Sequence, residues 1–303
     1  MARIETAFSR LLGITYPIVG APMFLVSYED LVVAVSEAGG LGAFPLPNYR
    51  TLAALEAALG RIRSRTARPI AVDVHVSGRF PYREQLAICL DHGVRFFFTS
   101  LGDPALIVDT VHDSGGLVYT EVISRRQALR AKTKGVDGLV AIGAGAGGHT
   151  GDIPLPVLVP DILDATGLPL LAAGGISRGS QLAAALALGA DGVLVGTRLV
   201  ASVEAGVATA YKEAVVAARP EDIVSSTRLT GNSVNWLRAS LERVDSAPEL
   251  ASKRWREIWS AGLSVAQADS ILPAGEIVQA MAQDCLAALA RLPAVPVQGR
   301  DEA

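Results

Sequence analysis

Two glycine-bearing segments in the second half of the chain have the composition of anion-binding turns. Residues 172–177 read AAGGIS and residues 195–198 read VGTR, and each follows or ends an apolar run. Glycine lets backbone N–H groups approach an anion closely, and a helix that begins after such a turn adds the partial positive charge of its N-terminus. The two turns predict a phosphate-binding site; tight turns without a ligand are the alternative.

A third glycine-rich segment carries one imidazole. Residues 143–151 read GAGAGGHTG, and His149 is the ionisable residue among them. A histidine titrates near neutral pH, so it can take up or release a proton during a reaction. We expect His149 to act as an acid or base beside a flat ring that lies against glycine backbone; a histidine on a surface loop is the alternative.

The other reactive residue types exclude several classes. The chain has 27 basic and 30 acidic residues, which leaves no basic excess for a nucleic-acid partner. Four histidines and two distant cysteines predict neither a metal centre nor a disulfide framework. A Schiff-base aldolase needs a Lys at a strand end, and that class is disfavoured because every Lys falls in a helical stretch. These are Lys132, Lys134, Lys212 and Lys253.

Neither a targeting segment nor a membrane span is predicted. Residues 1–17 mix charged and apolar positions and lack the continuous apolar region of a signal peptide. The most apolar stretch, residues 182–200, contains Asp191 and Arg198, so we interpret it as buried structure rather than a membrane helix. A cytoplasmic location and no membrane partner are therefore expected.

Eight short apolar runs must position these residues. They are typical of strands buried on both faces of a parallel sheet. They lie at residues 17–22, 41–45, 71–76, 96–100, 117–122, 138–143, 168–174 and 192–197. Stretches with helical spacing alternate with them, at 28–38, 51–62, 83–91, 104–113, 125–134 and 180–188. Glycines after most of these stretches match the ordinary ending of a helix.

Eight strand-and-helix units in about 200 residues predict an α/β protein of the (β/α)8 TIM-barrel class, with an open doubly wound sheet as the alternative. We expect residues 1–218 to form the barrel. Residues 219–303 should form a helical appendage of the same structural domain, with helices at 232–244, 252–260 and 274–290 and a polar tail after Pro293. Its apolar helices could cover the barrel mouth or serve a homodimer.

In such a barrel, functional residues lie at the C-terminal ends of the strands. Asp73 and His75 point to the same side of the third strand because side chains alternate, but that side could be the barrel interior or the helix layer. Glu121 near the end of the fifth strand is a similar case. Residues 20–23, which read GAPM, could line a pocket with main chain and a thioether.

These segments together resemble the nitronate monooxygenase (2-nitropropane dioxygenase-like) flavoproteins. That superfamily also contains FMN-dependent enoyl-ACP reductases and NADH:quinone reductases. The resemblance covers nearly the whole chain. It is carried by residues 14–18, 21–23, 38–42, 146–151, 172–176, 186–198 and 258–262.

The resemblance implies that the barrel holds FMN. The residues that would hold its phosphate are Gly174, Gly175, Gly196 and Thr197. The other cofactor contacts would be Pro22, Met23, Asp73, Glu121, Gly147, Gly148 and Ala173. His149 would be the catalytic acid or base facing the flavin, and residues 259–262 would come near the ring from the appendage.

The chain departs from the family pattern at three positions. Asp73 stands where the family often has Asn, Glu121 where some relatives have Lys, and Gly145 where a Glu is common. Two carboxylates facing the flavin would disfavour its anionic reduced forms and repel an anionic nitronate.

The resemblance implies an FMN-dependent oxidoreductase that oxidises alkyl nitronates or nitroalkanes with O2. An NAD(P)H-dependent FMN reductase of an enoyl thioester or quinone is the first alternative. A flavin-free isomerase or lyase of a sugar phosphate and a flavin-holding scaffold without turnover are the others.

Overall fold

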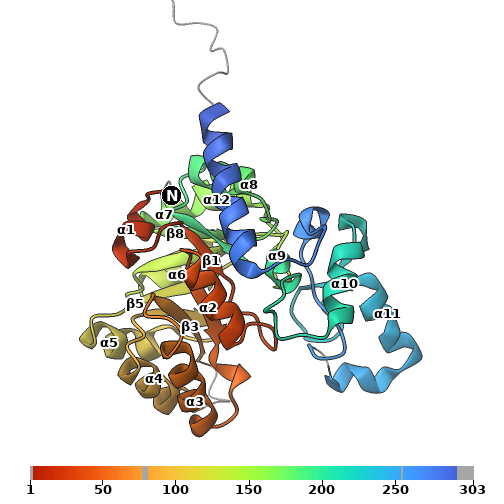
Figure 1. Cartoon of the computed structure of the whole chain (residues 1–303), viewed down its shortest axis with the longest axis horizontal. Coiled ribbons are helices and arrows are strands. Elements are labelled where there is room, and N and C mark those ends of the chain that lie inside the picture. The colour runs from red at the N-terminus through yellow and green to blue at the C-terminus, as the bar shows by residue number, and fades with distance from the viewer. Residues whose placement is uncertain (1–2, 77–80, 254, 292–303) are drawn as a thin grey trace, which may run out of the picture.

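Eight parallel strands form the centre of the molecule (Figure 1). They are β1 (Ile18–Gly20), β2 (Gly42–Pro45), β3 (Ile70–His75), β4 (Phe96–Ser100), β5 (Leu117–Val122), β6 (Gly138–Ile142), β8 (Leu170–Ala173) and β9 (Gly192–Val195). The computed structural model describes residues 3–76, 81–253 and 255–291. The strand order is β1-β9-β8-β6-β5-β4-β3-β2, and a parallel bridge between Val19 and Leu41 joins its two edges. The closed sheet confirms the (β/α)8 prediction and excludes an open doubly wound sheet.

Helices surround the barrel and alternate with its strands, as the spacing predicted. They are α2 (Glu29–Glu37), α3 (Leu52–Arg63), α4 (Tyr82–Asp91), α5 (Ala105–Asp113), α6 (Arg125–Lys132), α7 (Leu155–Thr166) and α8 (Gly179–Ala187). A short helix, α1 (Ala7–Leu12), precedes the first strand, and a 3-10 turn, η1 (Leu46–Asn48), follows β2. Phe8 of α1 packs against Phe96 inside the barrel, with ring centroids 5.6 Å apart.

Alternation along the strands decides what enters the barrel. On β3, Val72 and Val74 pack in the outer core under the helices, whereas Ala71 belongs to the inner cluster. Because successive side chains point to opposite faces, Asp73 and His75 continue the inner row toward the mouth. The interior is therefore apolar below and polar at the rim.

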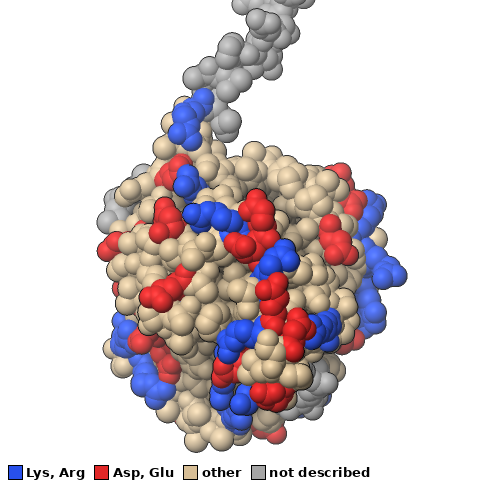
Figure 2. Space-filling model, turned by 90° about the vertical axis from the view of Figure 1, so that its right-hand side faces the viewer, with Lys and Arg blue, Asp and Glu red and all other residues tan. Residues whose placement is uncertain are grey.

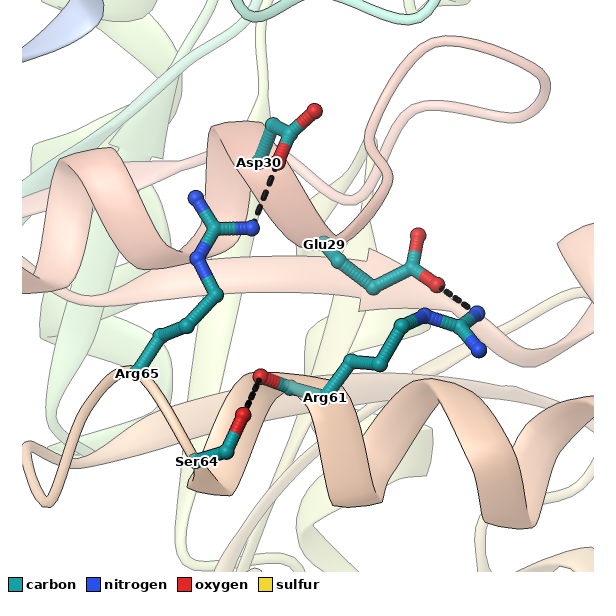
Figure 3. A network of polar contacts seen from close by, with 5 residues as sticks. All are labelled: Glu29, Asp30, Arg61, Ser64 and Arg65. Atoms are coloured by element: carbon teal, nitrogen blue, oxygen red, sulfur yellow. Dashed lines mark hydrogen bonds and ion pairs between the residues drawn. The ribbon is translucent and has the colours of Figure 1, made fainter.

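Ion pairs tie neighbouring helices of the outer layer together. Figure 3 shows Arg61 and Arg65 of the α3 region reaching Glu29 and Asp30 at the start of α2, while the Ser64 hydroxyl donates to the Arg61 carbonyl oxygen at 2.8 Å. Exposed pairs of this kind contribute about 0–1 kcal/mol each. Burial of Leu55, Leu59 and other apolar residues beneath them is the larger stabilising term.

The chain after β9 mixes helices with a small second sheet. It contains α9 (Thr197–Val200), α10 (Thr209–Ala217), η2 (Pro220–Asp222), β10 (Ile223–Ser226), β11 (Val234–Leu237), α11 (Arg238–Ser246), η3 (Pro248–Lys253), η4 (Leu263–Gln267) and α12 (Ala274–Arg291). β10 and β11 pair antiparallel, and β11 also pairs with β7 (Gly148–His149) of the glycine-rich segment. In Figure 1 the green-to-blue elements α10 and α11 stand beside the barrel.

Two of the three helix predictions for this region were wrong in part. Residues 232–244 begin as strand β11 because Val234 and Trp236 alternate inward against a small core, and α11 starts only at Arg238. Residues 252–253 end η3, and residues 255–260 form a turn and isolated bridges. The third helix is confirmed as α12. The expected polar tail after Pro293 lies outside the described residues.

Helix α12 packs on the outside of the barrel rather than over its mouth. Its buried face, which includes Ile277, Val278 and Met281, joins the outer core. At the crossing with α8, a Cβ on Gly179 would lie 1.9 Å from the Met281 carbonyl oxygen. Glycine is thus required for the two backbones to approach this closely.

Among the described residues, no helix is both long and apolar enough to cross a bilayer. Figure 2 shows basic and acidic side chains interspersed over the face that carries the C-terminal elements. Nor do the described residues gather three or more His, Cys, Asp or Glu side chains in a metal-binding cluster.

Candidate active site

A cavity of about 440 Å³ opens at the C-terminal ends of the barrel strands. Its walls combine strand ends, the segment 143–149 and parts of the C-terminal region. The twelve residues predicted as catalytic or cofactor-binding all line it. They are Pro22, Met23, Asp73, Glu121, Gly147, Gly148, His149, Ala173, Gly174, Gly175, Gly196 and Thr197. The fold brings them together; their individual roles remain predictions.

Gly174 and Gly175 form a turn whose backbone conformation favours glycine. Both have positive φ, 112° and 73°, a conformation that costs other residues energy. A Cβ on Gly174 would lie 2.8 Å from the Ala146 nitrogen, whereas a Cβ on Gly175 would meet no protein atom within 4 Å. The turn therefore packs tightly on one side and is open on the other.

The helix after this turn contributes less than the sequence suggested. The first N–H groups near α8, those of Ser177 and Arg178, donate to the Gln181 Oε1 at 2.7 and 3.0 Å. These two N–H groups and that of Ser180, which donates to the Asp284 Oδ2 at 2.8 Å, are already satisfied, so an anion at this site would need other backbone N–H groups.

Thr197 provides a hydroxyl beside the turn. Its Oγ1 accepts a hydrogen bond from the Gly262 N–H at 2.9 Å. Because the oxygen acts there as acceptor, the hydroxyl hydrogen is available to donate. Thr197 is buried and lines the cavity, which makes it a suitable partner for a bound anion.

Gly145, one of the departures from the family pattern, has a packing reason. A Cβ on it would lie 3.1 Å from the Gly175 nitrogen, and its carbonyl oxygen accepts hydrogen bonds from Gly175 and Leu263. Gly262 is constrained more tightly, since its Cβ would lie 2.3 Å from the Gly145 oxygen. Three glycine-containing segments meet here, and a larger side chain at 145 would push them apart.

His149 is held by segments from the middle and the C-terminal part of the chain. It ends β7, opposite Val234 of β11. The Asn235 side-chain amide donates to the carbonyl oxygens of Ala144 and Ala146 at 2.9 and 2.7 Å. These contacts fix the backbone on which the imidazole stands.

Trp255 covers the imidazole. Its indole lies 5.4 Å from the His149 ring and 4.9 Å from the Trp236 ring, centroid to centroid. Burial lowers the pKa of His149 below its ordinary value, because an imidazolium is poorly solvated here. The neutral ring, which can accept a proton, therefore predominates at neutral pH.

Two carboxyl groups, those of Asp73 and Glu121, line the same cavity. Ser100, at the end of β4, donates to the Asp73 Oδ2 at 2.8 Å. Burial raises the pKa of Asp73 to about 7 and is the main reason that the pKa of Glu121 rises to about 8, to which the Asp73 charge adds. The interior placement of Asp73 and His75, which the sequence left open, is decided by the barrel.

Sequence reasoning missed several cavity residues. They are Ser100, Tyr211, Trp255 and Ser264. Ser100 could have been found, since it ends a strand on the inward side. The others come from segments without a strand pattern. Of the residues 259–262 expected near the ring, Ser260 lines the cavity, whereas Trp259 does not and stacks on Tyr211 with ring centroids 5.1 Å apart.

A second cavity of about 520 Å³ adjoins the first. Both are lined by Leu101, Glu121, Ile142 and His149. The side chains that line the second cavity alone include Arg130 and Lys134 of the α6 region. Glu121 and His149 thus stand where the two spaces meet.

Comparison with known proteins agrees with this geometry. The family model of nitronate monooxygenase matches residues 5–80 and 75–284. The chain is 26% identical over 275 residues to a probable nitronate monooxygenase of Staphylococcus saprophyticus, covering 76% of this chain and 77% of that one. FabK of Thermotoga maritima superposes with a TM-score of 0.87 and 28% identity over 97% of this chain and all of its own. Nitroalkane oxidase of Streptomyces ansochromogenes superposes with a TM-score of 0.83 at 27% identity, over 95% of this chain and all of its own.

A second group of relatives is named for a carboxyl-CoA compound, which is a thioester. The (3aS,4S,5R,7aS)-5-hydroxy-7a-methyl-1-oxo-octahydro-1H-indene-4-carboxyl-CoA dehydrogenases of Mycobacterium tuberculosis and Rhodococcus jostii are 32% and 31% identical to this chain. The matches cover 80% and 76% of this chain and 69% and 65% of those proteins, so the chain spans about two thirds of their length. From the family model, these relatives and the superposed structures, we conclude that the chain belongs to the nitronate monooxygenase family and is an oxidoreductase.

Proposed function

We propose that the chain is an FMN-dependent enzyme of the nitronate monooxygenase type, which oxidises nitroalkanes or their nitronates with O2. The observation that carries the proposal is that a neutral imidazole, His149, and the glycine turn at 174–175 line one cavity. A proton acceptor and an anion cradle are the two groups that this chemistry asks of the protein.

The residues at the cavity fit an FMN group. The open side of Gly175, the N–H groups around Gly196 and the Thr197 hydroxyl could hold a phosphate. Gly148 also has no protein atom within 4 Å of where a Cβ would stand, which leaves room for a flat ring against the backbone. Pro22 and Met23 add an apolar wall. When bound, FMN would supply the electron transfer to oxygen.

His149 would take the proton from the carbon that carries the nitro group. An imidazole must be neutral to accept a proton, and burial keeps it so at neutral pH. Its backbone is fixed by the pairing of β7 with β11, and Trp255 restricts the ring and excludes water from one side. Positioning of this kind lowers the barrier by avoiding reorganisation during the reaction.

A second function is favoured by the adjoining cavity. A nitroalkane needs little room, whereas the second space of about 520 Å³ meets the first at Glu121 and His149. An acyl or enoyl thioester could extend through both, with NAD(P)H as electron donor for reduction. The two dehydrogenase relatives named for a carboxyl-CoA substrate support this alternative.

An absorbance spectrum of the purified protein, followed by anaerobic titration, separates the candidates. We expect a flavin spectrum that is bleached by a nitronate and only slowly by NADH or NADPH. Bleaching by NADH or NADPH within seconds would support the thioester or quinone reductase instead. A colourless protein that takes up no FMN would contradict both, and a flavin that no donor reduces would point to a scaffold.

A further inference from the structure

Two acidic side chains at the rim of the barrel stand on strands β3 and β5. Asp73 stands on β3 and Glu121 on β5, and Ser100 ends the intervening strand β4. The Ser100 hydroxyl donates to the Asp73 Oδ2. The other oxygen, Oδ1, is buried and accepts no hydrogen bond from the described residues. Both acids line the cavity of the proposed active site.

No Lys or Arg among the described residues lines the cavity beside these two groups. The bases in its described lining are His75 and His149, and burial lowers the pKa of His149 and keeps that imidazole neutral, so two carboxylates here would lack a Lys or Arg counter-charge. Like charges in a poorly solvated site rarely ionise together, so one of the two acids commonly stays protonated. The burial-raised pKa values of Asp73 and Glu121 agree with this expectation.

We propose that Asp73 and Glu121 act together as an acid pair that retains one proton and positions the ligand ring by donating a hydrogen bond from the retained carboxylic O–H. The inference rests on the proposed function, because the ring is that of FMN. An oxygen or ring nitrogen at the edge of such a ring is an acceptor, which a carboxylic acid can serve and a carboxylate cannot.

The net charge of the acid pair depends on whether it retains its proton. With one proton retained the pair carries one negative charge; when the proton leaves, it carries two and has no donor. Ligand binding should therefore weaken as the pH rises through the range in which the pair loses its proton. Since bound ligand favours the protonated pair, the loss of affinity with pH reports the proton directly.

Other ionisable groups face the pair and define the controls. His75, His149 and Tyr211 line the same cavity. Burial lowers the pKa of His149 and raises that of Tyr211 to about 12, so neither should titrate near pH 8. His75 calls for a His75→Gln variant.

Further charged or ionisable groups lie beyond the cavity wall. Tyr119 lies below Glu121 on β5, and burial raises its pKa. Glu121 also lines the second cavity, whose four other Lys, Arg, Asp or Glu side chains are Asp103, Arg130, Lys134 and Asp152. Lys134 forms an ion pair with Asp103 at 2.9 Å.

The test is the affinity for FMN itself, measured by fluorescence titration of flavin-stripped protein between about pH 7 and about pH 9. For the unmodified chain and the His75→Gln control we expect the dissociation constant to rise at least about tenfold over this range. In Asp73→Asn and in Glu121→Gln the remaining carboxyl loses its like-charged neighbour, so the midpoint should move to lower pH. In the double variant the constant should vary less than about twofold.

The outcomes separate this inference from the proposed function. FMN binding with a flat profile in the unmodified chain would overturn the proposed proton-retaining acid pair alone. The same would follow from a pH-dependent profile that persists in the double variant. Absence of FMN binding at every pH would overturn both. If one single variant fails to fold, as judged by circular dichroism, the other still gives the shift of the midpoint.

Discussion

The indole of Trp255 packs against the imidazole of His149, with ring centroids 5.4 Å apart and ring planes inclined by 51°. Trp255 lies roughly a hundred residues after His149 in the chain and adopts a positive φ of 73° to reach this position. A left-handed backbone is unfavourable for a bulky residue. The surrounding packing against Trp236 must compensate for it, which makes the C-terminal region a part of the candidate active site.

Replacing His149 with Gln should leave FMN bound but lower kcat/KM for a neutral nitroalkane by about 10²–10⁴-fold, the usual contribution of a positioned base. A preformed nitronate has already lost the proton, so its oxidation should fall much less. Steady-state oxygen consumption with both substrates measures the difference. An equal loss for both would argue against the role of His149 as a base.

Replacing Trp255 with Ala should move the pH profile of kcat/KM. Burial lowers the pKa of His149, so its basic form persists to lower pH than that of an exposed histidine. Removing the indole hydrates the imidazole and raises its pKa toward the ordinary value, and activity should then be lost at a higher pH on the acid side. Trp255→Phe, which keeps an apolar ring, serves as the matched control and should shift the profile less.

The stability of the protein should depend on the acid pair with a defined sign. Folding raises the pKa of Asp73 from 3.8 to about 7 and that of Glu121 from 4.5 to about 8. The unfolded chain releases these protons first, so their burial destabilises the fold increasingly as the pH rises from about 4 to about 8. Below the unfolded pKa values this penalty vanishes. The Tm of Glu121→Gln relative to the unmodified chain should therefore be higher at pH 8 than at pH 5; an equal difference at both pH values would refute the argument.

Two glycine substitutions should have opposite effects on stability. In Gly179→Ala the new methyl group would overlap the α12 backbone at Met281, and the helices must separate, at about 1–3 kcal/mol or more. In Gly60→Ala, on α3, nothing lies within 4 Å of the new carbon, and removal of a helical glycine should stabilise by about 0.5–1 kcal/mol. Urea unfolding of both variants measures the contrast, and similar midpoints would show that α8 and α12 can part without penalty.

Much of the fold followed from local patterns. The eight strands could be predicted because a buried parallel strand is a continuous apolar run, and glycines mark the ends of the helices that follow. The glycine turns at 143–151, 172–177 and 195–198 could also be recognised in the sequence, because glycine is the residue type that such backbone conformations favour. Even the inward alternation of Asp73 and His75 was available from the sequence, though not which side was inward.

Tertiary structure alone decided what those residues meet. The pairing of His149 with Val234, the cover of Trp255 and the Asn235 contacts all join segments far apart in the chain, and no local periodicity encodes such partners. Residues 232–244 were expected to be helical, but residues 234–237 of this range form β11, because a distant segment of the chain supplies its strand partner β7. The altered proton affinities of Asp73 and Glu121 likewise exist only in the barrel, because desolvation and mutual repulsion arise when folding removes water from two acids and brings them together.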